Sequence, residues 1–182
     1  MWSHTVAILV GGQSRRMGEP KHRVKLPNGK TMIDMMIEFA ESTASAVVIV
    51  GGDVEGVQSL HDQRNQQGPV AGIEALLSSG VDEQYLVVGC DMPQLQPADV
   101  QPLLSCEGNA VFSYENHILG LPIKISQEML PNCTSYLDSN KRSMKSFISL
   151  CTHTSIPINS SQLETMTSMN TREEITQLFK TE

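Results

Sequence analysis

Two charged residues, Lys21 and Asp91, occupy positions that suit the binding of a phosphate and a divalent cation. Lys21 closes a loop that contains glycines and arginines, and a lysine ammonium is a compact charge that can neutralise phosphate oxygens. Asp91 follows the apolar run YLVVGC, and Mg²⁺ is commonly held by one or two carboxylates together with phosphate oxygens and water. An aspartate two positions before Pro93 is also a common turn cap. The residues alone leave both interpretations of Asp91 open.

The loop before Lys21 has the composition of an anion-binding turn. Gly11 and Gly12 end the apolar run TVAILV, and glycines let a ligand approach the backbone amides closely. Arg15 and Arg16 then add positive charge. Roughly twenty residues separate this strand from the next expected helix, whereas such connections usually have about 2–6 residues and longer ones tend to be functional.

A second glycine-containing segment, GPVAG, spans residues 68–72 at the start of another expected helix. A glycine such as Gly72 inside a first helical turn is costly unless something packs close to it. Either a base or sugar of a bound nucleotide, or close packing of the helix on a sheet, would explain it.

Apolar runs and helical patterns alternate around these residues. Residues 5–10, 46–50 and 85–90 are predicted to be strands, because nearly continuous apolar runs are typical of parallel strands covered on both faces. Apolar spacing predicts helices between them over residues 31–41 and 70–79. This alternation predicts an α/β fold with a mainly parallel sheet, which would bring residues that follow the strands to one edge.

The regular alternation of predicted strands and helices ends after Asp91. Helices are predicted over residues 97–104, 143–150 and 171–179, the last with a capping box between Thr171 and Glu174. Strands are predicted over 109–114, 118–125 and 152–158, of which the first two could pair antiparallel. Residues 155–161 are loop-like, but too few to separate domains. We therefore expect 182 residues in a single domain.

Composition excludes several classes of protein. The net charge of −7 argues against a nucleic-acid binder, which normally carries a basic surface. The four cysteines are scattered without a CxxC pair, so a structural zinc site is not expected. No segment approaches the ~20 apolar residues of a membrane span, and the first residues do not resemble a secretion signal. These observations predict a cytoplasmic protein that binds neither nucleic acid nor membrane.

Four segments together resemble the molybdenum cofactor guanylyltransferases, the MobA-like nucleotidyltransferases. LVGGQSRRMGEPK (9–21) matches the opening loop of the family, with Val10 in place of alanine. GPVAG (68–72), CDMP (90–93) and NTREE (170–174) match its later segments in the same order and at similar spacing. The combination is far more specific than any one of these segments.

The resemblance implies a fold, a reaction and a set of site residues. The fold is three-layered and Rossmann-like, with a mostly parallel sheet and an antiparallel element in the C-terminal half. The reaction is the transfer of GMP from GTP to the molybdopterin cofactor, with Mg²⁺ as cofactor. Residues about 1–95 would bind nucleotide and about 96–182 the acceptor. The implied nucleotide-binding residues are Leu9, Val10, Gly11, Gly12, Lys21, Asp62 and Asp91. Lys21, Asp91 and Arg15 would be catalytic, Asp91 would bind the metal, and Arg142 and Asn170 would meet the acceptor.

The chain departs from the family pattern at a few places. Pro20 stands where an aspartate usually precedes the lysine, and HILGLP (117–122) replaces a usual Gln-Pro or His-Pro. SNKRSMKSF (139–147) keeps Arg142, for which a solvated helix end is the simpler interpretation. The alternatives are a cytidylyltransferase acting on the same cofactor and a non-catalytic nucleotide-binding protein of this fold. Molybdoenzymes or other proteins of the cofactor pathway are possible partners.

Overall fold

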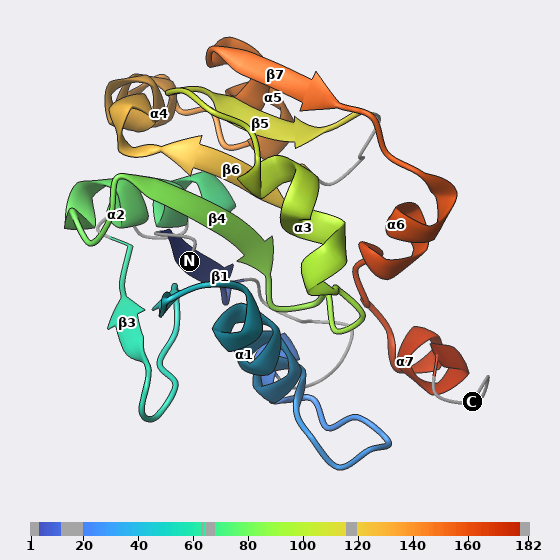
Figure 1. Cartoon of the computed structure of the whole chain (residues 1–182). Coiled ribbons are helices and arrows are strands. Elements are labelled where there is room, and N and C mark those ends of the chain that lie inside the picture. The colour runs from blue at the N-terminus through green and yellow to red at the C-terminus, as the bar shows by residue number, and fades with distance from the viewer. Residues whose placement is uncertain (1–3, 12–19, 63, 65–67, 116–119, 179–182) are drawn as a thin grey trace.

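A seven-stranded sheet forms the centre of the computed structural model, which describes residues 4–11, 20–62, 64, 68–115 and 120–178 (Figure 1). The strand order is β3-β2-β1-β4-β6-β5-β7. The strands are β1 (Thr5–Leu9), β2 (Ala46–Val50), β3 (Gln58–Leu60), β4 (Gln84–Gly89), β5 (Val111–Tyr114), β6 (Ile123–Ser126) and β7 (His153–Ile156). Only β6 runs antiparallel to its neighbours β4 and β5. This confirms the mostly parallel sheet with an antiparallel element in the C-terminal half.

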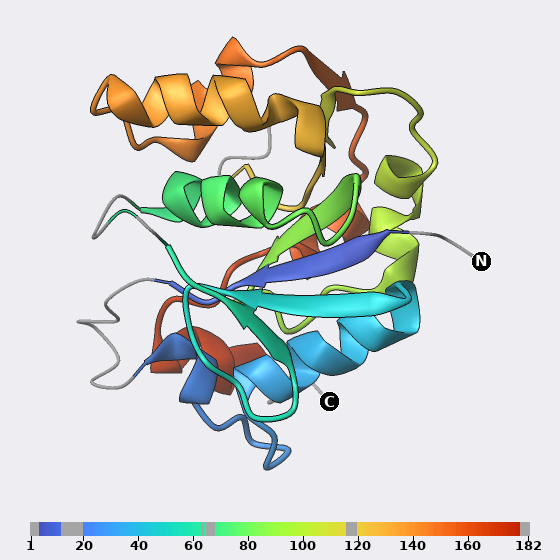
Figure 2. The same cartoon turned by 90° about the vertical axis from the view of Figure 1, so that its left-hand side faces the viewer.

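Helices cover both faces of the sheet, so the molecule has three layers (Figure 2). α1 (Met32–Thr43) and α3 (Pro97–Leu104) pack on one face, and α2 (Pro69–Ser79), α4 (Leu130–Asp138) and α5 (Met144–Leu150) pack on the other. β1 sits between the two cores: Val6 and Ile8 point to one, Ala7 and Leu9 to the other. The nearly continuous apolar run of β1 follows from this burial on both faces.

A third, small apolar cluster brings the C-terminal part of the chain back to the first loop. It joins the residues that follow the 3-10 turn η1 (Lys21–Arg23) and the start of α1 to α7 (Arg172–Leu178). Its buried members are Val24, Leu26, Met32, Met169 and Ile175. Met32 and Met36 are buried, as expected of methionines that fill the core. The cluster places Asn170, which lies between Met169 and α7, near Lys21.

Among the α-helices and β-strands of the described residues, three are absent from the sequence predictions: β3, α4 and α6 (Ser160–Thr165). β3 is a three-residue edge strand with the sequence QSL, too short to show any periodicity. The helix α4 carries only three buried residues, Cys133, Tyr136 and Leu137, so its apolar stripe is weak. Part of the segment expected to be a loop, 155–161, belongs instead to β7 and α6.

Of the strand expected over residues 118–125, residues 118 and 119 lie outside the described residues, and β6 begins at Ile123. Pro122 has no N–H to donate to a neighbouring strand, which explains why regular pairing starts after it. The antiparallel pairing of this strand with β5 is confirmed. Among the described residues, no helix is long and apolar enough to cross a membrane.

Candidate active site

The ends of β1, β2 and β4 lie at one edge of the sheet. Leu9, the last residue of β1, is paired with Val50 and with Gly89. The backbone continues this alignment beyond the strands, because the Cys90 N–H donates to Leu9 O at 3.1 Å and the Val10 N–H donates to Val50 O at 2.8 Å. The glycine-rich loop and Asp91 therefore leave neighbouring strands at the same edge, which is where ligands bind in open α/β sheets.

Lys21, Asp91 and Asn170 meet at this edge. Lys21 Nζ donates hydrogen bonds to Asp91 Oδ2 at 2.9 Å and to Asn170 Oδ1 at 2.6 Å. The Lys21 and Asp91 side chains keep 22% and 20% of their surface exposed, so the pair is accessible to a ligand. The expectation that the Lys21 amine and the Asp91 carboxylate lie close together is confirmed. Their catalytic and metal-binding roles stay predictions.

Further hydrogen bonds hold the segment around Asn170 against this pair. The Met169 N–H donates to the backbone carbonyl of Asp91 at 2.8 Å. Glu174 Oε2 accepts the N–H groups of Asn170 and Thr171 at 2.6 and 3.0 Å, while the Glu174 N–H donates to Thr171 Oγ1 at 3.2 Å. The predicted capping box is thus confirmed, and it fixes the start of α7 beside the site.

Asp62 follows β3 at the same edge and is unusual for a carboxylate. Its Oδ1 atom is buried and has no hydrogen-bond partner in the described part of the chain. Burial raises the pKa of this carboxyl above its ordinary value, because the charged form loses its hydration. A buried acceptor without a donor carries an energetic cost, which a bound ligand with a suitable N–H or O–H would relieve.

Gly72 is explained by close packing. A Cβ atom at this position would lie 3.0 Å from Val50 Cγ1, 3.5 Å from Asp62 Oδ1 and 3.6 Å from Leu9 Cδ2. The absence of a side chain lets α2 approach the ends of β1 and β2. Of the two explanations that the sequence left open, the structure shows the packing of helix against sheet.

The remaining predicted nucleotide-binding residues differ in what the structure shows of them. The side chains of Leu9 and Val10 are buried in the two cores, and the Val10 N–H is bonded to Val50, so a ligand would meet mainly backbone here. Gly11 is exposed, and no atom of the described residues lies within 4 Å of the place where its Cβ would be. Gly12, predicted to bind nucleotide, and Arg15, predicted to act in catalysis, lie outside the described residues.

Arg142 is exposed on the connection between α4 and α5. Its backbone carbonyl is 3.8 Å from where a Cβ of Gly68 would be, so this segment borders the start of α2. Cys90, next to Asp91, is buried, and burial raises the pKa of its thiol to about 12. A thiol that stays protonated at neutral pH is a poor nucleophile, so Cys90 acts as a small core residue.

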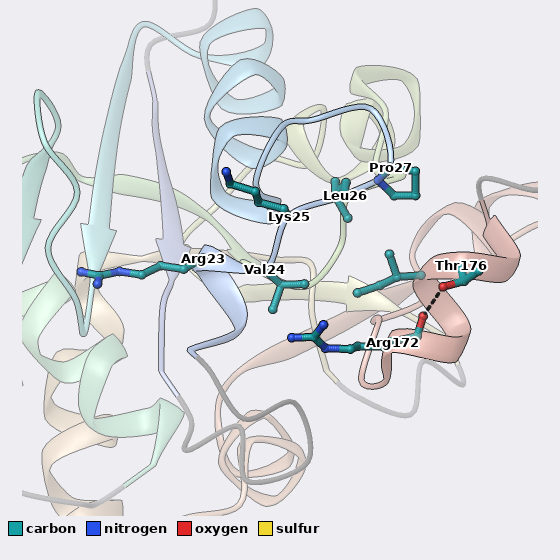
Figure 3. A pocket seen from close by; sticks show the side chains of 8 residues that line it. Arg23, Val24, Lys25, Leu26, Pro27, Arg172 and Thr176 are labelled. Atoms are coloured by element: carbon teal, nitrogen blue, oxygen red, sulfur yellow. Dashed lines mark hydrogen bonds between the residues drawn. The ribbon is translucent and has the colours of Figure 1, made fainter.

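A pocket of about 400 Å³ lies between residues 23–27 and α7 (Figure 3). Arg23, Lys25 and Arg172 line it together with apolar residues of the third cluster. The Arg23 side chain extends away from α7, so these cations do not converge on one point (Figure 3). This basic lining was not predicted, although the sequence KHRVK at 21–25 alternates charged and other residues and could have indicated it.

The described residues contain no group of three or more His, Cys, Asp or Glu side chains arranged to hold a metal ion. Asp91 stays the predicted carboxylate ligand. That agrees with the way Mg²⁺ is held in nucleotide enzymes, where most ligands are phosphate oxygens and water.

Comparison with known proteins shows the family to which this chain belongs. Residues 6–155 match the family described as MobA-like NTP transferase domain. A probable molybdenum cofactor guanylyltransferase of Carboxydothermus hydrogenoformans is 34% identical over 109 residues, which cover 58% of this chain and 54% of that protein. Another, from Flavobacterium johnsoniae, is 25% identical over 182 residues, covering 96% of this chain and 95% of that protein.

The chain spans only about half the length of several other curated relatives, for example 54% of the Carboxydothermus protein and 35% of a bifunctional molybdenum cofactor biosynthesis protein of Synechocystis. Among solved structures, a molybdopterin-guanine dinucleotide biosynthesis protein A from Archaeoglobus fulgidus superposes with a TM-score of 0.80. That match covers 97% of both chains at 21% identity, and it shows the same fold.

Proposed function

Because the chain belongs to the family of MobA-like NTP transferase domains, we propose that it transfers GMP from GTP to the terminal phosphate of the molybdenum–molybdopterin cofactor. The products are the guanine dinucleotide form of the cofactor and pyrophosphate. The names of the relatives from Carboxydothermus and Flavobacterium support this choice of reaction. The observation that carries the proposal is the 2.9 Å contact of Lys21 Nζ with Asp91 Oδ2, since a cation and a carboxylate this close can act on one triphosphate.

In this proposal Lys21 neutralises charge on the nucleotide phosphates. Nucleotidyl transfer needs in-line alignment and charge neutralisation more than covalent help from the protein. A lysine ammonium has three N–H donors, and Asp91 and Asn170 account for two of them. The third can therefore reach a phosphate oxygen while both contacts persist. Arg15 would add a second positive charge to the same loop.

The acceptor needs little activation. A phosphate monoester is largely ionised near neutral pH, so it can attack the α-phosphate without a strong protein base. The role of the chain is to bring that phosphate into line with the bond to be broken. Arg142 and Asn170 are the candidates for binding it.

Asp91 is the proposed ligand of Mg²⁺, and its carboxylate oxygens are the hard donors that this ion prefers. When bound, the ion supplies Lewis-acid neutralisation of the reacting phosphates. Asp91→Asn removes the negative charge while keeping the shape of the side chain. We expect the Mg²⁺ concentration for half-maximal activity to rise about tenfold or more, because a charge-assisted contact contributes ~1.5–3 kcal/mol. A Mg²⁺ titration of activity that is unchanged in Asp91→Asn would remove this residue from the metal site.

The decisive experiment measures pyrophosphate release from GTP in the presence of the molybdopterin acceptor, with CTP and ATP as controls. We expect release with GTP that depends on the acceptor. Release that is faster with CTP would instead identify a cytidylyltransferase. Tight binding of nucleotide without any release would identify a non-catalytic binding protein of the same fold.

We also propose that the protein works in the cytoplasm and that its product passes to molybdoenzymes. The four cysteines are free in the structure, as suits a reducing compartment. Copurification of the dinucleotide product with an apo-molybdoenzyme, dependent on this chain, tests the second part.

A further inference from the structure

Arg64 joins three parts of the molecule through one guanidinium group. Its Nε and Nη2 atoms donate to Glu74 Oε2 and Oε1 at 2.6 and 3.0 Å, which forms a two-pronged contact with α2. Its Nη1 atom lies 2.8 Å from Oδ1 of Asp138, the last residue of α4. The side chains of Arg64, Glu74 and Asp138 are 29%, 14% and 61% exposed, so the contact with Glu74 is the better shielded of the two.

This ion-pair network lies next to the residue predicted to bind nucleotide. Arg64 is two positions after Asp62, so their Cα atoms can be no more than about 7 Å apart. Glu74 is two positions after Gly72, against which the Asp62 carboxylate packs. A guanidinium fixed on Glu74 therefore limits where Asp62 can lie relative to α2 and to the strand ends.

Asp62 needs such a constraint. Within the described part of the chain its buried Oδ1 atom accepts no hydrogen bond, so no donor orients that oxygen. A buried carboxylate that loses hydration and has no partner is driven toward solvent. Something else must hold it at the edge of the sheet, and the Arg64 contact is the strongest nearby candidate.

We infer that Arg64 is a positioning residue for nucleotide binding: its two-pronged contact with Glu74 holds Asp62 at the edge of the sheet in the geometry that the nucleotide requires. This inference rests on the proposed function, in which Asp62 contacts the nucleotide. The guanidinium nitrogens are engaged by Glu74 and Asp138, so Arg64 acts through Asp62. Lysine cannot replace it fully, because an ammonium lacks the planar fork that pairs with both carboxylate oxygens.

The test is the equilibrium affinity for a fluorescent guanine nucleotide with Mg²⁺, measured on the full chain without any acceptor. We expect Arg64→Gln and Glu74→Gln each to raise the Kd about five- to tenfold, since both break the charge-assisted pair. Arg64→Lys should recover part of the loss. Asp138→Asn should stay within about twofold of wild type, because that pair is the more exposed.

Lys30→Gln is the matched control, since it breaks an exposed ion pair with Glu38 on α1 that does not involve Asp62. We expect its Kd to equal that of wild type. Thermal unfolding of every variant shows that binding is measured on folded protein. In steady state, Arg64→Gln should raise the KM for GTP while kcat at saturating GTP stays within about twofold, as expected when uniform binding is lost.

Equal Kd values for wild type, Arg64→Gln and Glu74→Gln would overturn this inference, as would an equal loss in Lys30→Gln. Neither result would contradict the proposed function. Conversely, a wild-type chain that binds no guanine nucleotide would overturn the proposed function itself. The two failures are therefore distinguishable from the same titrations.

Discussion

Lys21 is held by two protein oxygens, from Asp91 and Asn170, and the proposed reaction needs the same ammonium to bind phosphate. Such pairing orients the amine before the nucleotide arrives, so less side-chain entropy is lost on binding. Contacts with two distant parts of the chain therefore fix the orientation of the Lys21 side chain before the nucleotide binds. Partial exposure of the pair makes its contribution to stability small.

Lys21→Ala is therefore expected to lower the rate far more than the stability. The lost charge-assisted contact costs ~1.5–3 kcal/mol in the transition state, which corresponds to about one to two orders of magnitude in rate. Steady-state kinetics with GTP measure the first effect, and thermal unfolding measures the second. An unchanged rate would show that Lys21 does not act in the site.

Asp62 illustrates a conflict between stability and function at a single residue. Burial raises the pKa of its carboxyl in the folded protein above the ordinary value of 3.8, which the unfolded chain keeps. Between 3.8 and the raised pKa, the folded protein therefore binds more protons than the unfolded chain. The contribution of Asp62 to the free energy of unfolding therefore falls as pH rises through that window. Above that window the ionised group is a cost to folding.

Asp62→Asn should consequently stabilise the protein at pH 7 and weaken nucleotide binding. We expect a rise in Tm, and for a domain of this size each kcal/mol of stabilisation corresponds to roughly 2–4 °C. The gain should shrink as the pH is lowered toward 3.8, where the wild-type carboxyl is neutral as well. Calorimetry over this pH range measures the effect, and a constant difference at all pH values would contradict the explanation.

At the scale of elements, strand β4 positions Asp91 through its last residue, Gly89. A Cβ at Gly89 would lie 2.6 Å from Asp91 Oδ1, closer than real Cβ contacts come. The next nearest atoms belong to Met92, at 3.7 Å, and pose no obstacle. The bare backbone at this position leaves the space that the Asp91 carboxylate occupies.

Gly89→Ala should therefore displace the Asp91 carboxylate without unfolding the strand, because the end of an aspartate side chain can move. We expect activity to fall about ten- to a hundredfold, as misplacement by about 1 Å commonly does. The Mg²⁺ requirement should rise as in Asp91→Asn. A Gly89→Ala enzyme with wild-type Mg²⁺ dependence would show that the carboxylate has not moved, or that it does not hold the ion.

The elements that sequence patterns predicted well are those with strong local signals. β1, β2 and β4 show long apolar runs, and the helices α1 and α2 show apolar stripes with a capping residue or a proline at the start. β3 lacks such signals because it has only three residues, and α6 is short and largely polar, although Asn159 and Gln162 form a capping box at its start. Their positions depend on contacts with other elements. β3 pairs with β2, and Gln162 of α6 donates a hydrogen bond to the backbone carbonyl of Asp99 in α3.

At the scale of the whole molecule, the N-terminal half (about 1–95) and the C-terminal half (about 96–182) share one sheet. β4 pairs with β1 of the first half and with β6 of the second. α2 likewise packs against α4 and α5, and the three helices contribute to one core. The two halves are thus joined through both backbone hydrogen bonds and apolar packing.

We therefore expect thermal unfolding in one cooperative transition. Separate unfolding of either half would leave β4 with an unpaired edge and would expose the shared core, which is costly. Differential scanning calorimetry should give equal calorimetric and van't Hoff enthalpies, as two-state unfolding requires. Two resolved transitions would show instead that the halves are independent domains.

The sequence by itself determined the α/β class, the main strands and helices, and the edge of the sheet at which Lys21 and Asp91 would meet. It could do so because apolar periodicity is local and because parallel strands end at a common edge. Only the tertiary structure decided the partners of these residues. Asn170 binds Lys21 from 149 positions away, and Arg64 binds Glu74 and Asp138 on two different helices. Contacts between such distant residues follow from how the helices pack on the sheet, and they leave no periodic trace in the sequence.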